Sequence, residues 1–243
     1  MRDRLILLPG WGLGISPLEP LAAALRGVDE HLQVHIEPLP ALDSSDLNEW
    51  LEELDATLPD NVWLGGWSLG GMLASELAAR RGARCCGLVT LASNPCFVGH
   101  DGWPNAMPAE TFDAFLAGCH ADSLVTLKRF GLLCAKGAAD PRGLARLLVG
   151  GAPNTPSEGL MNGLELLAQL DTRDALLAYR GPQLHLFGGM DELVPAEAAS
   201  ELLALLPEVE IGLIEQAGHA FLLEDPHGVA AAIQAFLHEC VDD

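Results

Sequence analysis

Short apolar runs alternate along the chain with longer segments that repeat apolar residues every three or four positions. The runs are short and separated by helical stretches, which is typical of strands in a parallel sheet. Crossover helices between such strands cover both faces of the sheet. The pattern therefore predicts an α/β fold with a mostly parallel central sheet flanked by helices; the expected strands are 5–8, 33–36, 62–65, 87–92, 183–187 and 209–214.

Helical periodicity separates most of these runs, and the expected helices include 17–26, 45–57, 69–81, 195–206 and 226–240. The alternation stops after Pro95, and the segment 100–179 has helical patterning with no convincing strand. We therefore expect a core formed by residues 1–99 and 180–243, with residues 100–179 as a helical cap inserted over the carboxyl ends of the strands. A separate small helical domain is the alternative.

Composition excludes several classes of function. The formal net charge is −21 over 243 residues, which disfavours nucleic acid and anionic membranes as partners because their phosphates would be repelled. The six cysteines show neither Cys-x-x-Cys pairs nor a matching histidine spacing, so we expect no metal site and no disulfide framework. The apolar run near the N-terminus is too short for a signal peptide, and we expect a cytoplasmic monomer.

One window departs from the acidic composition. Between residues 123 and 156 five basic residues face one acid, Asp140, which gives the window a net charge of +4. The basic residues are Lys128, Arg129, Lys136, Arg142 and Arg146. A solvated helix face is one interpretation of this window, and a docking surface for an acidic partner is the other.

The run 62–65 leads into Gly66-Trp67-Ser68-Leu69-Gly70 and then into helix-forming residues. A serine on a sharp turn from strand to helix needs neighbours without side chains, because the backbone there is strained and crowded. The helix N-terminus that follows favours an oxyanion. Ser68 is therefore the predicted nucleophile of an ester or acyl hydrolase.

A serine nucleophile needs a histidine base and a carboxylate that orients the histidine. Asp191 follows the expected strand 183–187 and is the predicted acid, with its neighbour Glu192 as the rival. His219 follows the last expected strand between small residues, comes after Asp191 in the chain, and is the predicted general base.

The developing oxyanion needs two backbone N–H donors. Leu69, directly after the nucleophile, supplies one, and the loop after the first strand supplies the other. That loop is Pro9-Gly10-Trp11-Gly12, so the Trp11 N–H is the predicted second donor. A plain turn is the alternative for this loop.

Together these residues resemble the α/β-hydrolase family over nearly the whole chain. Within it, the chain is similar to the carboxylesterases of biotin synthesis, which cleave the methyl ester of pimeloyl-acyl-carrier protein. The similarity is carried by Gly-Trp-Gly at 10–12, Gly-Trp-Ser-Leu-Gly-Gly at 66–71, the segment 91–97, Trp103-Pro104, Arg129-Phe130 and 163–167. The chain has Pro9-Gly10 where the family usually has His-Gly.

The resemblance implies an α/β-hydrolase fold with a helical cap and a serine esterase that uses Ser68, His219 and Asp191 through an acyl-enzyme. It implies no cofactor, since base and oxyanion hole suffice for acyl transfer. It also implies that Trp11 and Phe130 contact substrate, and that Arg129, Arg142 and Arg146 dock the acidic acyl-carrier protein. A broad short-chain carboxylesterase or thioesterase, and a hydrolase fold that binds ligand without turnover, remain alternatives.

A second set of cap residues is compatible with an acyl channel, although helical apolar residues also serve as plain core. The set is Phe112, Phe115, Phe130 and Leu133.

Overall fold

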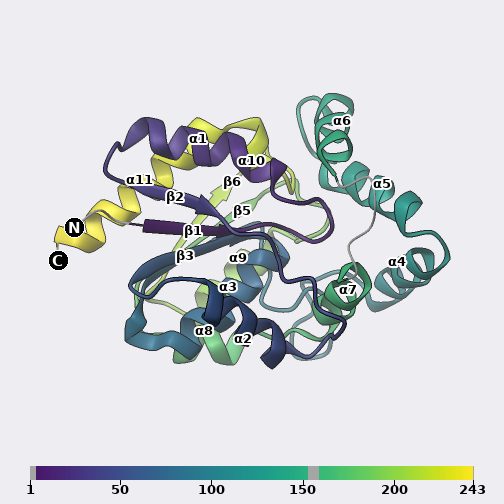
Figure 1. Ribbon diagram of the computed structural model, residues 1–243. Helices are drawn as coiled ribbons and strands as arrows, with labels where there is room; N and C mark the ends of the chain where they lie inside the picture. Colours follow the sequence, from purple (N-terminus) through teal and green to yellow (C-terminus); the bar gives the residue numbers. More distant parts are fainter. Residues whose placement is uncertain (1–3, 153–158, 243) are drawn as a thin grey trace.

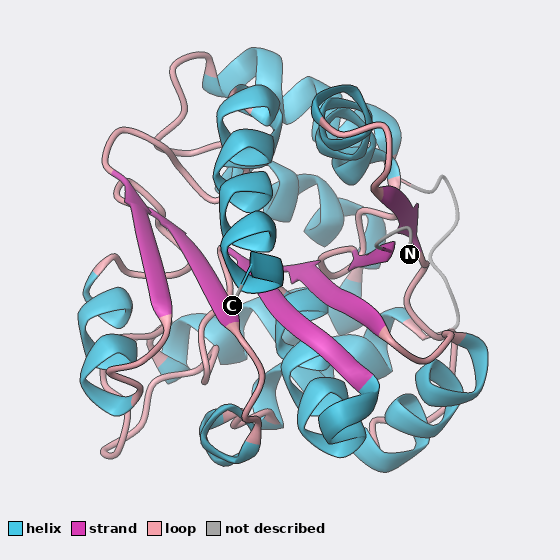
Figure 2. Ribbon diagram, turned by 90° about the vertical axis from the view of Figure 1, so that its left-hand side faces the viewer, coloured by secondary structure: helices cyan, strands magenta, loops and turns pink. Residues whose placement is uncertain are grey.

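The computed structural model describes residues 4–152 and 159–242. Its centre is a six-stranded sheet in the order β2-β1-β3-β4-β5-β6, in which every neighbouring pair is parallel. The strands are β1 (Arg4–Leu8), β2 (Gln33–Ile36), β3 (Val62–Trp67), β4 (Cys85–Leu91), β5 (Gln183–Gly188) and β6 (Glu210–Ile214). The parallel sheet expected from the sequence is confirmed, and Figure 2 shows its twist between layers of helices.

Burial along each strand follows its place in the sheet. Every residue of β3 and β5 is buried, because helices cover both faces of these strands. The edge strand β2 alternates, with Val34 and Ile36 buried and Gln33 and His35 exposed. The central strands with continuous burial and the edge strand with alternating burial therefore belong to the same sheet.

Helices cover both faces of the sheet (Figure 1). One face carries α1 (Glu19–Val28), α10 (Phe221–Glu224) and α11 (Pro226–Asp242), and the other carries α2 (Leu47–Thr57), α3 (Leu69–Arg81) and α8 (Arg173–Ala178). The remaining core elements are α9 (Glu197–Leu205) and two short 3-10 turns, Ser16–Leu18 and Gly82–Arg84.

Helix boundaries differ slightly from the sequence expectation where local chemistry competes with periodicity. A helix was expected from residue 17, but Ser16–Leu18 forms a 3-10 turn and α1 begins at Glu19. Pro20 then occupies the first turn of α1, where a missing N–H removes no helical hydrogen bond. At α2 the side chain of Asp46 accepts hydrogen bonds from the N–H groups of Asn48 and Glu49, which fixes the start of that helix.

The segment after β4 is helical. It contains α4 (Ala109–Ala121), α5 (Ser123–Cys134), α6 (Pro141–Gly151) and α7 (Leu160–Gln169), which we call the cap helices. They lie beyond the carboxyl ends of the strands (Figure 1). The next helix, α8, packs against α3 beneath the sheet, although its residues fall within the expected cap 100–179. The division between core and cap at residues 99 and 179 stays a prediction.

None of the helices within residues 4–152 and 159–242 combines the length and the apolar character needed to cross a membrane.

Candidate active site

Ser68 lies at the turn between β3 and α3, at the carboxyl edge of the sheet. Its backbone φ is 55°, a value that L-residues rarely adopt. The turn is so tight that a Cβ at Gly66 would overlap the backbone of Gly70, and a Cβ at Gly70 would overlap the carbonyl oxygen of Leu8. The two glycines are therefore required by close backbone approach, and Ser68 is held at the N-terminus of α3.

Asp191 follows β5, and its side chain is completely buried. Its Oδ1 accepts hydrogen bonds from the N–H groups of Leu193 and Val194, at 2.8 and 3.0 Å. These bonds fix the rotamer and leave Oδ2 directed at His219. Glu192, the rival in the sequence, is instead exposed and pairs with Lys136 at 3.1 Å.

His219 follows β6 and is fully buried. Its Nδ1 lies 2.8 Å from Oδ2 of Asp191, which assigns the Nδ1 proton to this hydrogen bond and leaves Nε2 as the acceptor. Nε2 is also buried and has no hydrogen-bond partner in the described part of the chain. An unpaired imidazole nitrogen in a buried site is available to take a proton from a hydroxyl group.

Trp67 connects the serine to the histidine. It precedes Ser68, its indole Nε1 donates to the carbonyl oxygen of His219 at 3.0 Å, and the two rings are 5.5 Å apart. Ser68, Asp191 and His219 therefore lie in one cluster at the carboxyl ends of β3, β5 and β6. Ser68 is 3% exposed, so the cluster is closed to bulk solvent in this conformation.

The expected oxyanion loop lies between the sheet and the cap helices. The indole Nε1 of Trp11 donates to the carbonyl oxygen of Leu160 at 2.7 Å. The Trp11 ring contacts Phe115 of α4 and Phe130 of α5 edge-on, with ring centroids 5.5 and 5.2 Å apart. Leu69 is the first residue of α3, where the first N–H groups have no partner within the helix.

A small cavity lies beside Trp11 and has a volume of about 170 Å³. Besides the 10–12 loop, residues 38–41, Trp50 and Leu160 line it. The lining is mostly apolar and suits an aliphatic chain. Sequence reasoning missed these lining residues: Trp50 falls inside the expected helix 45–57, and the signal for 38–41 was its position directly after the expected strand 33–36.

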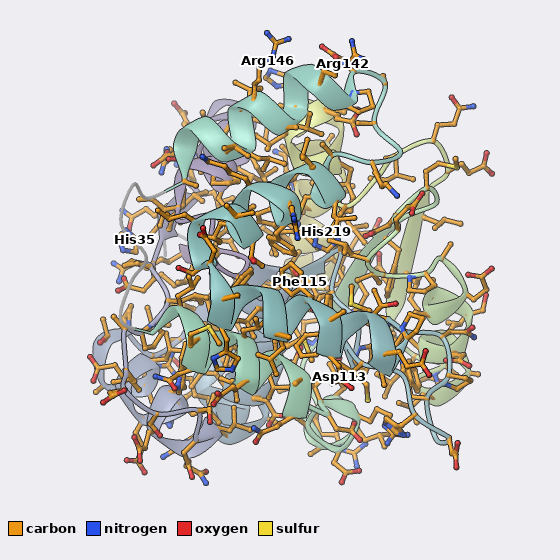
Figure 3. All side chains as sticks on the ribbon, turned by 90° about the vertical axis from the view of Figure 1, so that its right-hand side faces the viewer. His35, Asp113, Phe115, Arg142, Arg146 and His219 are labelled. Carbon is orange, nitrogen blue, oxygen red and sulfur yellow. The ribbon has the colours of Figure 1, made fainter. Side chains whose placement is uncertain are left out.

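The three cap arginines point outward. Arg129 lies on α5, and Arg142 and Arg146 lie on α6; all three are exposed. Within residues 4–152 and 159–242 none of them forms an ion pair. Figure 3 shows Arg142 and Arg146 on the outer side of α6, with His219 deeper in the molecule.

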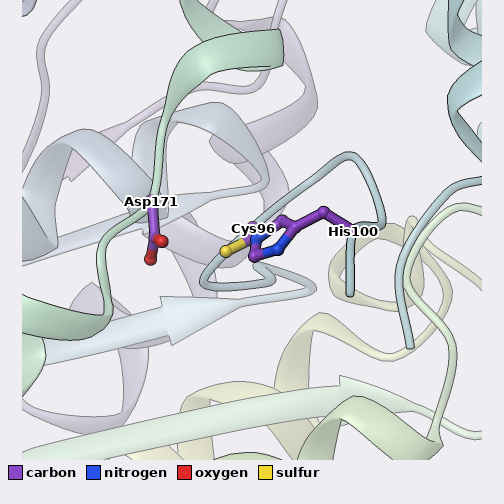
Figure 4. A group of neighbouring side chains, drawn as sticks. All are labelled: Cys96, His100 and Asp171. Atoms are coloured by element: carbon purple, nitrogen blue, oxygen red, sulfur yellow. The ribbon is translucent and has the colours of Figure 1, made fainter. Parts of the chain in front are cut away.

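In the part of the chain that the structure describes, one group of potential metal-ligand side chains occurs away from this cluster. Donor atoms of Cys96, His100 and Asp171 lie within 4.8 Å of one another (Figure 4). Nδ1 of His100 accepts from the Gly102 N–H, and the bidentate pair with Arg173 lowers the pKa of Asp171 to about 2. Burial raises the pKa of Cys96 to about 12. Nδ1 of His100 and the Asp171 carboxylate are therefore already hydrogen-bonded, and the Cys96 thiol is protonated. The group also joins the segment after β4 to the segment before α8.

Comparisons with known proteins identify the family of the chain. The family described as alpha/beta hydrolase fold matches residues 35–226. The pimeloyl-[acyl-carrier protein] methyl ester esterase of Serratia marcescens is 33% identical, over 96% of this chain and 93% of its own length. The esterase of the same name from Klebsiella pneumoniae is 36% identical, over 91% of this chain and 88% of its own length.

A longer relative and a solved structure extend the comparison. The biotin biosynthesis bifunctional protein BioHC of Teredinibacter turnerae is 35% identical over 98% of this chain, which spans only 45% of that protein. The esterase EaEST from Exiguobacterium antarcticum superimposes with a TM-score of 0.83, at 20% identity, over 97% of this chain and 92% of its own. The chain therefore belongs to the alpha/beta hydrolase family.

Proposed function

We propose that this chain is a serine carboxylesterase of biotin synthesis that hydrolyses the methyl ester of pimeloyl-[acyl-carrier protein]. The observation that carries the proposal is the buried hydrogen bond between Asp191 and His219, which leaves Nε2 of His219 unpaired, together with the contact of His219 with Trp67, the residue before Ser68. The relatives named as esterases of this methyl ester, which cover most of the chain, supply the substrate.

In the first half of the reaction the Ser68 hydroxyl attacks the ester carbonyl carbon, and its proton passes to Nε2 of His219. Asp191 holds the imidazole in the required tautomer and stabilises its positive charge. The N–H groups of Trp11 and Leu69 stabilise the oxyanion. Collapse of the tetrahedral intermediate transfers the proton from His219 to the methoxide, and methanol leaves an acyl-enzyme.

In the second half a water molecule replaces methanol. His219 takes one proton from the water as its oxygen attacks the acyl-enzyme, and the same two N–H groups hold the second oxyanion. The proton then returns to the Ser68 oxygen, and the free pimeloyl carboxylate is released on its carrier.

The exposed arginines on α5 and α6 supply a docking surface for the acyl-carrier protein. The chain as a whole repels acidic partners, but exposed charges are screened beyond about 8 Å at physiological ionic strength. Local charge therefore decides docking, and unpaired guanidinium groups attract acidic side chains. Beside Arg146 on α6, Leu147 is 67% exposed and adds an apolar contact for the same partner.

The substrate is tested by comparing esters. We expect kcat/KM for pimeloyl-[acyl-carrier protein] methyl ester to exceed that for short p-nitrophenyl esters by about 100-fold or more, because contacts with the carrier contribute binding energy to the reaction. Steady-state kinetics with the purified protein measures both values. Efficient turnover of short esters alone would instead identify a general carboxylesterase. If a serine-directed phosphonate failed to label the protein, the chain would be a binding protein.

The docking surface is tested by reversing two of its charges. We expect Arg142→Glu with Arg146→Glu to raise KM for the carrier-linked ester about tenfold, and to leave kcat/KM for a short free ester unchanged.

A matched control is Arg4→Glu with Arg180→Glu, which makes the same charge change. Arg4 begins β1 and Arg180 precedes β5, so both exposed side chains lie at the end of the sheet opposite the cap helices. Equal effects of the two double variants would show a general charge effect and no docking surface.

A further inference from the structure

The loop between α5 and α6, residues 135–140, lies against the segment that carries Asp191. Gly137 has a φ of 80°, and a Cβ at this position would overlap the carbonyl oxygen of Met190. The backbone of this loop therefore packs directly on the residue before Asp191.

The same loop lies against the segment that carries His219. A Cβ at Gly218 would overlap the carbonyl oxygen of Lys136, so these two backbones are also in close contact. The N–H of Ala139 donates to Oε1 of Glu224 at 2.9 Å, and Glu224 lies in α10, directly after the His219 segment. The loop thus touches the chain on both sides of the base.

The loop begins directly after the buried end of α5. Cys134 is completely buried at the C-terminus of α5. Burial raises the pKa of its thiol, and the negative charge of Asp191 raises it further. The buried end of α5 therefore anchors the start of the loop in the packed interior.

Two hydrogen bonds also join the segments after β5 and β6 to each other. The N–H of Gly189 donates to the carbonyl oxygen of Ile214, and the N–H of Met190 donates to that of Ala217, both at 2.9 Å. A displacement of one of these two segments is therefore expected to displace the other as well.

From these contacts we infer that residues 136–139 are a positioning loop, which holds Asp191 and His219 in their hydrogen-bonded arrangement from the cap side. The inference rests on the proposed function, in which these two residues are the acid and base of the reaction. The loop also links α5 and α6, the helices that carry Arg129, Arg142 and Arg146, so displacement of either helix reaches the acid and base through it.

Gly137→Ala tests the inference. The new methyl group pushes Met190 away, and misplacement of catalytic groups by about 1 Å costs up to about 100-fold in rate. We expect kcat for a short p-nitrophenyl ester to fall at least about tenfold, with KM changed less than about twofold. Proton NMR of the Nδ1–H of His219, which resonates far downfield in a short bond to a carboxylate, is expected to show loss or a shift of that signal.

Gly82→Ala is the matched control for backbone strain. Gly82 has a φ of 53°, and a Cβ there meets nothing within 4 Å. The substitution therefore lowers stability through φ alone, and we expect it to leave kcat and the NMR signal unchanged. A folded Gly137→Ala protein whose kcat stays within about twofold of the Gly82→Ala value would overturn the inference.

A second pair of variants decides the question if Gly137→Ala does not fold. Glu224→Ala removes the acceptor for the Ala139 N–H from an exposed position, and Glu224→Gln keeps an oxygen there. We expect kcat to fall about threefold in Glu224→Ala and to recover in Glu224→Gln; equal kcat values would count against the loop.

The two levels of proposal fail in different ways. If the wild-type protein hydrolyses no ester and a phosphonate does not label Ser68, the proposed function is wrong. If the wild-type protein is active but the loop variants match their controls, only the positioning role is wrong. The NMR signal reports on the Asp191–His219 hydrogen bond in either case.

Discussion

Replacing Ser68 by alanine is expected to lower kcat for ester hydrolysis by about a millionfold, to the level of the other groups acting on bound ester alone. The substitution removes the only atom proposed to form the acyl-enzyme. His219 and Asp191 keep their hydrogen bond, but with no hydroxyl to activate they contribute little, because residues of such a cluster act as a unit. Active-site titration with a serine-directed phosphonate, followed by mass spectrometry, measures the loss together with steady-state kinetics.

Ser75→Ala is the control for this substitution. Ser75 lies in the same helix, α3, and its buried hydroxyl donates to the carbonyl oxygen of Gly71 at 2.8 Å. We expect Ser75→Ala to lose some stability and to keep kcat, and the phosphonate to label it at Ser68. Retention of more than about 1% of wild-type kcat in a folded Ser68→Ala protein would mean that another group is the nucleophile.

The fold was largely predictable because its elements are encoded locally. The strand Gln33–Ile36 and the helix Leu69–Arg81 have the expected bounds; Glu37 follows the strand, and Ser68 and Gly82 flank the helix. β3 continues to Trp67, two residues beyond the expected end, because the sheet ladder includes the weak strand formers Gly65 and Gly66. Tertiary hydrogen bonding overrides propensity there.

The cap was predictable only as a set of helices. Periodicity shows that a helix has an apolar face, but not which partner covers that face. Phe115 and Phe130 pack on Trp11, whereas Phe112, which has the same apolar character, packs on Phe97 with ring centroids 6.1 Å apart. Which phenylalanines line an acyl channel stays a prediction.

Contacts made by backbone left no signal in the sequence. The packing of Gly137 on Met190 depends on a carbonyl oxygen and on a positive φ, which no residue type specifies uniquely. In contrast, Asp191 and His219 could be predicted because each follows a strand that ends at the same edge of the sheet. The roles of Ser68, Asp191 and His219 stay proposals that substitutions have to test.

Replacing Asp191 by asparagine is expected to lower kcat about ten-thousandfold, with little change in KM. The reason lies in how the carboxylate is anchored. Its Oδ1 accepts from the N–H groups of Leu193 and Val194, so the carbonyl oxygen of an asparagine takes that position and its NH₂ group faces His219. An NH₂ donor opposite Nδ1 makes that nitrogen the acceptor, and the proton moves to Nε2. Steady-state kinetics on a short ester measures the loss.

Glu192→Gln separates this effect from a general loss of negative charge beside the site. It removes the same charge one residue along the chain, but Glu192 is exposed and, among the described residues, pairs with Lys136 alone. Exposed ion pairs contribute at most about 1 kcal/mol. We therefore expect its kcat to stay within about threefold of wild type. If Glu192→Gln lost as much activity as Asp191→Asn, the orienting role would not belong to Asp191 alone. If Asp191→Asn kept most of the activity, His219 would not depend on a carboxylate, and the proposed mechanism would be wrong.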